Sequence, residues 1–435
     1  MSRDLLITDV TFTDGSRGDL AISGGQIVDA DQVRDPERRD GAGLVALPGL
    51  VDPHTHLREP GREDAETLAT GTRAAARGGF TAVCAMANTN PVTDTAEQVQ
   101  WLLQTAARDS SAQVVPVGAV SKGLAGVELA ELGLMARAGV RMFSDDGHCV
   151  HDAQLMRRAL EYLGPLGGII AQHAQDPRLA GPDACCHEGP ESGRLGLPGW
   201  PAVAESTIIA RDAELALLTG TPVHVCHVST AESVEVLRWA KGRGAPITAE
   251  VTPHHLALTV AEVTGYDPTY KVNPPLRASS DAEVLAAALV DGTIDVVGTD
   301  HAPHASHDKA HTFQDAAFGM LGLEQALGVV TEVLVSPGRL TWAEVADRMS
   351  AGPARLARIA GQGRPVAVGE PANICLVDPS ARRTVDAATS ASLSRNNPWH
   401  GRELPDPVVL TLWGGRVTFD RQGDPAASAG DEMEE

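Results

Sequence analysis

The chain has 435 residues, of which 43% are hydrophobic, so it can bury a substantial core and is long enough for one large and one smaller domain. Its 57 acidic and 35 basic side chains give a formal charge of −22, which argues against nucleic acid as a partner because phosphate binding needs a basic patch. No run approaches the roughly 20 apolar residues that cross a bilayer, and the start lacks the apolar core of a signal peptide. We therefore expect a cytoplasmic protein without a membrane partner, whose six cysteines, none in a CxxC pair, are reduced thiols.

The two ends of the chain share one pattern, in which short alternating runs are separated by Gly and Asp. Residues 1–47 contain DLLITDVTFTDG and DLAISGGQIVDA, and residues 366–420 contain GEPANICLVDPS and PVVLTLWGGRVTFD. This pattern is typical of β-hairpins, so we expect the two segments to pair into one composite β domain. The polar, acidic tail 421–435 is expected to be disordered.

Between the two ends, residues 48–365 alternate short β-branched runs with helical patterns. The runs, the first of which starts at residue 44, are LVALPGLVDPHTH, FTAVCAMAN, QVVPVGAV, GVRMFSDD, GGIIAQHA, TPVHVCHVS, PITAEVTPHH and IDVVGTDHAPH. Eight strand-helix units predict an α/β fold with a parallel (β/α)8 TIM-like barrel. An open doubly wound sheet is the alternative, but the sequence shows no GxGxxG turn after the first strand.

The segment 94–110 illustrates the helical pattern. Asp94 is the expected N-cap, with Glu97 three residues further on. The apolar positions follow i, i+3, i+4, i+7 spacing: Val99, Leu102, Leu103 and Ala106. This spacing predicts an amphipathic helix whose apolar face packs on the barrel.

The first barrel strand ends in a His-x-His pair. Residues two apart in a strand point to the same face, so His54 and His56 should converge on one point, which makes a metal site plausible. Arg58, two residues further, is expected on that same face. In a chain of this net charge, an anionic substrate must be attracted by local cations or metals, which makes Arg58 a candidate for binding one.

Titratable groups also close other predicted strands. They are Asp145 and Asp146 after the fourth, His173 after the fifth, His227 after the sixth, and Asp300 with His301 after the eighth. The carboxyl ends of barrel strands surround one mouth, where catalytic groups of this fold collect. Histidine and aspartate ligands suit Zn2+, and their number exceeds the three protein ligands typical of one catalytic zinc, which indicates two metals.

The other histidines are expected to have structural roles. His224 is out of phase with His227 and should face the helices, in the core or at the surface, whereas His254 and His255 should support the site or the fold. The remaining six are expected to be solvated: His148, His151, His187, His307, His311 and His400.

The motifs DPHTHLREPG, NTNP, FSDDG, QHA, HVST, NPPLR and GTDHAPH, in this order and with these separations, resemble those of the dihydroorotases of the amidohydrolase superfamily, in their long-chain bacterial class. The resemblance covers essentially the whole chain. It implies the reversible cyclisation of N-carbamoyl-L-aspartate to L-dihydroorotate in pyrimidine biosynthesis, by a metal-activated water and an aspartate proton shuttle. It is also compatible with a homodimer and with a complex with aspartate transcarbamoylase.

The resemblance assigns roles to single residues. It implies two Zn2+ ions held by these ligands: His54 and His56 on the first, His173 and His227 on the second, Asp146 as the bridge and Asp300 on the first. Asp300 is also the implied proton shuttle, and the choice of Asp146 over Asp145 follows the motif alignment alone. The implied substrate contacts are His56, Leu57, Arg58, Asn88, Asn273, His304 and the backbone of Phe318 and Gly319, with Arg58, Asn88 and His304 on the substrate carboxylate.

Two other functions remain to be distinguished. A hydantoinase, dihydropyrimidinase or allantoinase would use a carboxylated lysine on the fourth strand, but GVRMFSDDGHCV contains no lysine. A catalytically inactive homologue that scaffolds aspartate transcarbamoylase would be expected to have lost metal ligands, whereas all six candidates are present here.

Overall fold

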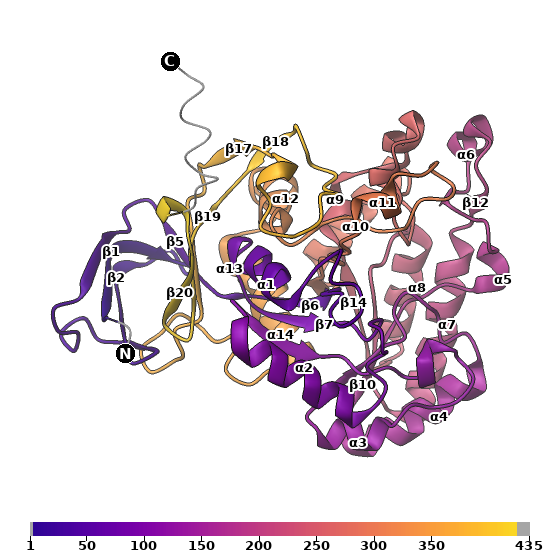
Figure 1. Ribbon diagram of the computed structural model, residues 1–435, viewed down its shortest axis with the longest axis horizontal. Helices are drawn as coiled ribbons and strands as arrows, with labels where there is room; N and C mark the ends of the chain where they lie inside the picture. The colour runs from indigo at the N-terminus through magenta and orange to yellow at the C-terminus, as the bar shows by residue number, and fades with distance from the viewer. Residues whose placement is uncertain (1–2, 424–435) are drawn as a thin grey trace.

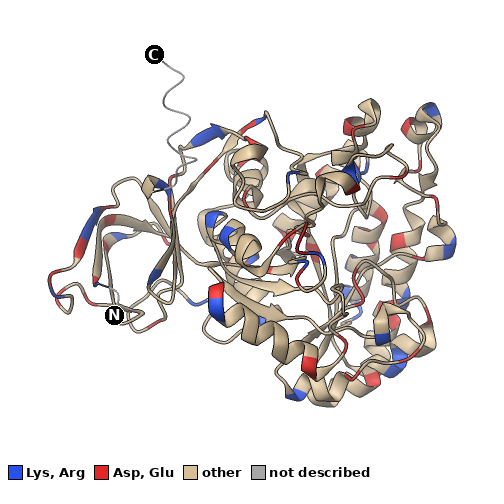
Figure 2. Cartoon of the chain, viewed as in Figure 1, with Lys and Arg blue, Asp and Glu red and all other residues tan. Residues whose placement is uncertain are grey.

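The computed structural model describes residues 3–423 and consists of a ring of strands with surrounding helices and a separate β-sheet at one side (Figure 1). The sheet lies at the left of the view and contains β1 (Leu5–Phe12), β2 (Arg17–Ser23), β5 (Val45–Pro48), β19 (Val408–Trp413) and β20 (Arg416–Asp420). Acidic and basic residues are spread over the sheet and the outer helices (Figure 2).

The ring is built from a three-stranded and a five-stranded parallel sheet. Their strands are β6 (Leu50–Thr55), β7 (Phe80–Ala85), β8 (Gln113–Pro116), β9 (Met142–Phe143), β10 (Ile169–Gln172), β13 (Val223–Val225), β14 (Ile247–Val251) and β15 (Val296–Val297). Parallel bridges between Gly118 and Phe143 and between Thr55 and His301 join the two sheets at both edges. All eight predicted runs therefore contribute one strand each, and the carboxyl ends of these strands lie on the same side of the ring.

The first predicted run is divided between the two parts of the molecule. Its beginning forms β5 (Val45–Pro48) in the side sheet, and its end forms β6 in the ring. Gly49 separates them where the backbone passes close to Thr81, because a Cβ at Gly49 would lie 2.3 Å from the Thr81 side chain. This run therefore contains two strands, one in each part of the molecule.

Helices follow the ring strands in the chain. The longer ones are α1 (Leu68–Arg77), α2 (Ala96–Asp109), α4 (Ala153–Leu163), α7 (Val203–Thr219), α8 (Ala231–Gly242) and α10 (Ser279–Asp291), and α3 (Leu132–Arg137) is a short helix. Shorter ones are α5 (Pro177–Ala180), α6 (Pro190–Leu195), α9 (Pro253–Ala257), α11 (Ser306–Lys309), α12 (Ala326–Val330), α13 (Trp342–Ala346) and α14 (Gly352–Leu356). In addition, β11 (Cys186–His187) pairs with β12 (Gly199–Trp200).

Helix α2 confirms the predicted segment but corrects two details. The N-cap is Thr95, whose side chain accepts from the Gln98 backbone N–H, and not Asp94. Val99, Leu102 and Ala106 are buried in the helix as predicted, whereas Leu103 is 38% exposed. The buried face is therefore narrower than the apolar pattern suggested.

The side sheet combines both chain ends. Its order is β20-β19-β16-β5-β1-β2-β3, with β4 paired to β1. The remaining strands are β1 (Leu5–Phe12), β2 (Arg17–Ser23), β3 (Gln26–Val28), β4 (Glu37–Asp40), β16 (Ile374–Val377), β19 (Val408–Trp413) and β20 (Arg416–Asp420). Alternating apolar residues give this sheet a hydrophobic cluster of its own, which includes Ile7, Leu20 and Ile374.

Residues 378–407 were predicted to belong to the β domain but lie against the ring instead. Ser392 and Leu393 bond to the buried Glu66, and Asn396 accepts from the His304 N–H. Within this segment β17 (Arg382–Thr384) and β18 (Glu403–Pro405) pair only with each other. The composite domain is therefore interrupted by a segment that approaches the carboxyl ends of the ring strands.

Other expectations concern the chain end and the cysteines. Residues 421–423 form one 3-10 turn, and the rest of the predicted disordered tail lies outside the described residues. All six cysteines are free thiols, as predicted. None of the helices within residues 3–423 combines the length and apolar character needed to cross a bilayer.

Candidate active site

The six residues predicted from the strand ends form one buried cluster at the carboxyl side of the ring. His54, His56, Asp146 and Asp300 place one ligand atom each within 4.8 Å of one another. A second group, within the same distance limit, consists of Asp146, His173 and His227. Asp146 belongs to both groups, so the cluster can hold metal ions on either side of it.

Asp146 lies between two pairs of imidazoles. Its Oδ2 is 3.3 Å from His54 Nε2 and 3.2 Å from His56 Nε2. Its Oδ1 is 3.3 Å from His173 Nδ1 and 3.2 Å from His227 Nε2. Burial alone would raise the pKa of this carboxyl, but the surrounding imidazoles hold it well below its usual range.

Asp145 points away from the cluster. Its carboxylate accepts from the backbone N–H groups of Val120 and Ser121 and from the Ser121 hydroxyl. These bonds connect the end of β9 to the turn after β8. Of the two adjacent aspartates, only Asp146 therefore has the geometry of a shared ligand.

Asp300 and His227 lie just beyond the last residues of β15 and β13. Asp300 Oδ1 is 3.0 Å from His56 Nε2 and 3.5 Å from His54 Nε2. Both Asp300 (φ 45°) and His227 (φ 33°) have positive φ, so turns, and not strand alternation, direct their side chains. Burial would raise the pKa of Asp300, but the neighbouring histidines, His54 first, lower it below the ordinary value.

Glu250 is a site residue that sequence reasoning missed. It is fully buried on β14, and its Oε1 lies 2.5 Å from His54 Nδ1. A Cβ at Gly298 would lie 2.5 Å from Glu250 Oε2, so the glycine leaves room for this carboxylate. Burial would raise the pKa of Glu250, but His54 and His224 lower it to about 2. The available signal was a glutamate in a mostly apolar ring strand, where an unpaired charge is costly.

His224 also faces this carboxylate, contrary to the prediction. Its Nε2 is 3.1 Å from Glu250 Oε2, and its Nδ1 is 2.9 Å from Thr248 Oγ1. The prediction was wrong because β13 ends at Val225, so the alternation that was counted from His227 does not extend through the strand end.

Three of the imidazoles are each oriented by a hydrogen bond at the ring nitrogen that faces away from the cluster. His54 Nδ1 contacts Glu250, His56 Nδ1 contacts Asn88 Oδ1 at 2.9 Å, and His173 Nε2 contacts Gln175 Oε1 at 2.7 Å. These partners assign a proton to the outer nitrogen, so the inner nitrogen, which is aimed at the cluster, is the one that would bind a metal ion. Asn273 Nδ2 donates to the same Gln175 oxygen at 3.2 Å.

The donor set fits divalent metal ions. His54 Nε2 is buried and has no hydrogen-bond partner among the described residues, although it points at Asp146 and Asp300. An orphaned imidazole nitrogen among carboxylates is the arrangement that a cation would satisfy. Nitrogen and oxygen donors of this kind suit Zn2+.

Glu250→Gln is expected to weaken metal retention by about tenfold or more, because the amide cannot hold His54 as strongly as the carboxylate. Competition with a chelator measures this affinity. Glu66→Gln is the matched control, since Glu66 is equally buried and contacts His301, which points away from the cluster. Equal metal affinity in both variants and the parent would contradict the role of Glu250.

Arg58 lies at the edge of the cluster as an unneutralised cation. Its Nε donates to the Pro303 carbonyl at 3.0 Å, and its guanidinium is 3.4 Å from His304 Nε2. Among residues 3–423 no carboxylate forms an ion pair with it, and burial lowers its pKa to about 10, so it stays charged at neutral pH. Arg58 has a positive φ of 61° and lies beyond β6, which ends at Thr55. The turn, and not strand alternation, therefore sets the direction of its side chain.

Of the other predicted substrate contacts, His304 lies beside Arg58 and connects it to Phe318. His304 Nε2 donates to the Phe318 carbonyl at 2.6 Å, and the Gly319 N–H donates to the Lys271 carbonyl at 2.9 Å. Burial and the nearby Arg58 lower the pKa of His304 to about 2, so its ring is neutral. The Leu57 side chain is 2% exposed and packs in the core, so a substrate contact could involve only its backbone.

The remaining histidines mostly occupy the expected places. His255 bonds to Thr252 and to the Pro274 carbonyl, and the neutral His254 is buried beside it, with its pKa lowered by burial to about 4. His301 accepts from backbone N–H groups away from the cluster. Five of the six expected to be solvated are exposed, whereas His187 is half-buried and accepts from Arg277.

Known proteins resemble this chain over nearly its full length. A family profile described as Dihydro-orotase-like matches residues 43–233. Curated proteins named dihydroorotase include one from Streptomyces coelicolor, 55% identical over 96% of this chain and 95% of the relative. Another, from Mycobacterium tuberculosis, is 53% identical over 94% of this chain and 96% of the relative.

Solved structures share the fold. An L-hydantoinase (dihydropyrimidinase) from Arthrobacter aurescens has a TM-score of 0.86 at 24% identity, covering 96% of both chains. A D-hydantoinase (dihydropyrimidinase) from Thermus sp. has a TM-score of 0.79 at 26% identity, covering 96% of this chain and 95% of that one. Parallel strands around a buried His/Asp cluster define an α/β enzyme fold with a site able to hold metal ions. Within that class, the chain belongs to the dihydroorotase family of the amidohydrolase superfamily.

Proposed function

We propose that this protein is a dihydroorotase, a zinc-dependent cyclic amidohydrolase that reversibly cyclises N-carbamoyl-L-aspartate to L-dihydroorotate in pyrimidine biosynthesis. The observation that carries the proposal is the unneutralised Arg58 guanidinium beside a His/Asp cluster. The substrate has a carboxylate that a guanidinium can bind and a cyclic amide that metal-assisted hydrolysis can open. The names of the relatives support the same activity.

Two Zn2+ ions would occupy the cluster within a (β/α)8 barrel formed by the ring. His54, His56 and Asp300 would hold one ion, His173 and His227 the other, and Asp146 both. Bound divalent metal supplies an activated water and polarises the amide carbonyl. Each ligand atom faces the cluster in the structure, which is the support for this assignment.

The chain's own residues orient the substrate and move the proton. Arg58, with Asn88 and His304 nearby, binds the carboxylate and so fixes the ring relative to Asp300. Asn273 and the Phe318–Gly319 backbone contact the ring itself. In hydrolysis the amide C–N bond breaks, and Asp300 takes the proton released by the attacking water and delivers it to the ring nitrogen.

A hydantoinase-type activity is the second candidate, since both structural relatives above have hydantoinase titles. Its implied carboxylated lysine has no counterpart here. Each of the four lysines bonds to a group outside the cluster: Lys122, Lys241, Lys271 and Lys309. Asp146 occupies the shared position instead. An inactive scaffold is also disfavoured, because all six candidate ligands are brought together.

The purified protein is expected to contain one to two equivalents of zinc or a similar divalent metal per chain. Elemental analysis measures the content, and the loss of dihydroorotate absorbance, with and without a chelator, measures the activity. Metal-free protein that gains no activity with zinc would contradict the proposal. A preference for dihydrouracil or hydantoin over dihydroorotate would favour the hydantoinase alternative.

The assembly and location of the protein remain predictions. Cytoplasmic localisation, a homodimer and a complex with aspartate transcarbamoylase agree with a biosynthetic role. Sedimentation of the protein alone and with the transcarbamoylase would test both assemblies.

A further inference from the structure

Two lysines, one buried and one half-buried, hold the segment that carries Phe318 and Gly319. This segment, residues 305–319, is named here the capping loop and includes α11. Lys271 is 3% exposed, and Lys309 is half-buried. Among residues 3–423 neither lysine forms an ion pair within 4 Å, although the chain as a whole is strongly acidic. Such cations are costly to bury unless their N–H groups are bonded.

Lys309 is bonded in three directions. Its Nζ donates to the carbonyls of Pro268 at 2.9 Å, Lys271 at 3.2 Å and Ala317 at 2.8 Å. An ammonium group has three N–H donors, so these carbonyls satisfy all of them. Burial, and then the Lys271 charge, lower the pKa of Lys309 to about 7. The lysine thus connects the start of the capping loop to its end and to residues 268–271.

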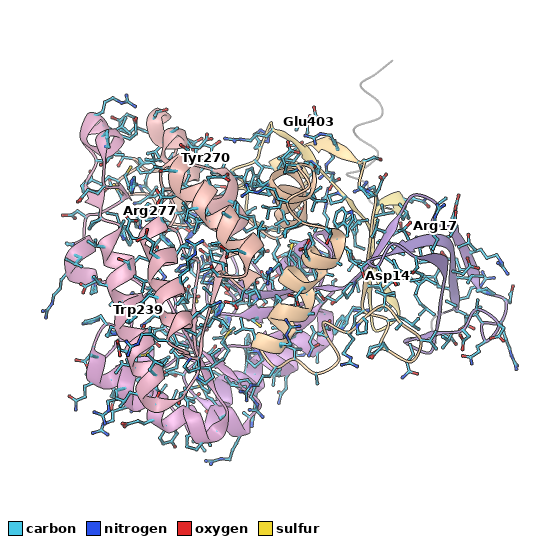
Figure 3. All side chains as sticks on the ribbon, turned by 180° about the vertical axis from the view of Figure 1, so that it is seen from behind. Asp14, Arg17, Trp239, Tyr270, Arg277 and Glu403 are labelled. Atoms are coloured by element: carbon cyan, nitrogen blue, oxygen red, sulfur yellow. The ribbon has the colours of Figure 1, made fainter. Side chains whose placement is uncertain are left out.

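Lys271 holds the other part of the capping loop. Its Nζ donates to the carbonyls of Gln314 and Ala316, both at 2.7 Å, and lies 4.1 Å from the centre of the Phe318 ring. Its own carbonyl accepts from the Gly319 N–H at 2.9 Å. Tyr270 and Arg277, which flank residues 271–276 in the chain, lie on the ring side of the molecule in Figure 3, away from Asp14 and Arg17.

These contacts continue to the candidate active site. Phe318 accepts from His304, and His304 lies beside the Arg58 guanidinium. Asn273, two residues after Lys271, bonds to Gln175 next to the cluster. The two lysines therefore lie where the capping loop, the 270–277 segment and the proposed carboxylate site meet.

We propose that Lys271 and Lys309 are positioning residues that clamp the capping loop so that the Phe318–Gly319 backbone and His304 are held in place for substrate. The inference rests on the proposed function for the identity of the substrate, but the clamp itself is a property of the free protein. Hydrogen bonds to a charged donor are stronger than neutral ones, so their loss releases the loop. Substrate binding weakens as a result, while the metal cluster, to whose residues neither lysine Nζ bonds, remains intact.

The test uses the full metal-loaded protein and its Lys271→Met and Lys309→Met variants. Amide hydrogen exchange over residues 305–319 is expected to become at least about tenfold faster, because local opening depends on these bonds. KM for dihydroorotate should rise about tenfold, while kcat changes by less than about threefold and metal content is unchanged. Lys241→Met is the matched control, since Lys241 is also half-buried but bonds to Asp295 and Gly292.

A third variant separates positioning from charge. Lys309→Arg keeps the positive charge, but a planar guanidinium cannot donate to three carbonyls around one nitrogen atom, so KM should still rise. Normal KM in Lys309→Arg together with fast exchange of the loop would overturn the clamp, because a released loop would then leave substrate binding unchanged. Unchanged exchange and KM in the methionine variants, or exchange that rises throughout the protein with loss of metal, would also overturn it. If Lys271→Met fails to fold, the Lys309 variants alone decide the question.

Failure of the clamp can be distinguished from failure of the proposed function. Wild-type protein that does not act on dihydroorotate, but whose loop still exchanges faster in the variants, would retain the clamp and exclude the substrate. Wild-type protein that is active, with variants that show neither effect, would retain the function and exclude the clamp.

Discussion

Replacing Asp300 by asparagine is expected to lower kcat by at least about 1000-fold, within the range that general acid-base catalysis supplies. Asp300 is 5% exposed, and its Oδ1 lies 3.0 Å from His56 Nε2 at the centre of the cluster. Asparagine preserves much of the shape but cannot accept a proton. Part of the bound metal should therefore remain, because His54, His56 and Asp146 are unchanged.

The two directions of the reaction should respond oppositely to pH. Hydrolysis needs ionised Asp300, so kcat/KM for dihydroorotate should fall as pH decreases, whereas cyclisation needs the protonated state and should slow as pH increases. The low pKa of Asp300 means that its ionised form predominates near neutrality. Because the cluster titrates as a unit, one apparent pKa should describe each profile.

Rates in both directions, with metal content, would test the role of Asp300. Asp145→Asn is the matched control, because Asp145 is a buried carboxylate next to Asp146 in the chain but bonds to the backbone of Val120 and Ser121. It should reduce stability and affect turnover far less. Near-native turnover of a metal-loaded Asp300→Asn enzyme would show that the proton follows another route.

Arg58→Met is expected to lower kcat/KM for dihydroorotate by about 3 kcal/mol, roughly 150-fold, the range for losing a charge-assisted contact in a closed site. No ion pair with a carboxylate among residues 3–423 neutralises this guanidinium, so substrate is the anion it is free to bind. Activity on a neutral cyclic amide should change much less. Lys or Gln at this position should not restore activity, because neither reproduces the planar fork of donors.

Steady-state kinetics with dihydroorotate and with dihydrouracil would measure the difference. Arg141→Met is the control, since Arg141 is also partly buried but bonds to the carbonyls of Ala136 and Val140, outside the site. It should affect both substrates little and equally. An equal loss on both substrates in Arg58→Met would mean that Arg58 supports the fold of the site and does not recognise a carboxylate.

The prediction of the cluster succeeded because it needed only strand order and strand ends. Four of the six residues lie at or just after the end of a parallel strand: His54, His173, His227 and Asp300. The carboxyl ends of such strands meet at one edge of the ring regardless of how the side chains pack. Apolar runs with β-branched residues identified all eight ring strands for the same local reason. The pairing of the two chain ends in one sheet was also foreseen from alternating runs.

Side-chain directions beyond the strand ends could not be predicted in this way. Arg58, His227 and Asp300 have positive φ, which interrupts the two-residue alternation on which the prediction relied. His224 was misplaced for that reason. The pattern also overlooked Glu250, because its importance comes from contacts with residues far away in the chain, His54 above all.

The sequence by itself thus determined the kind and order of the elements and the set of histidines and aspartates at the carboxyl edge, because periodicity and strand ends are local properties. The strand pattern could not distinguish Asp145 from Asp146, because both end the same strand and only packing turns one toward backbone N–H groups and the other toward four imidazoles. Only the tertiary structure also showed the bonds of Lys271 and Lys309 to the capping loop, because their acceptors are backbone carbonyls, which no sequence pattern identifies.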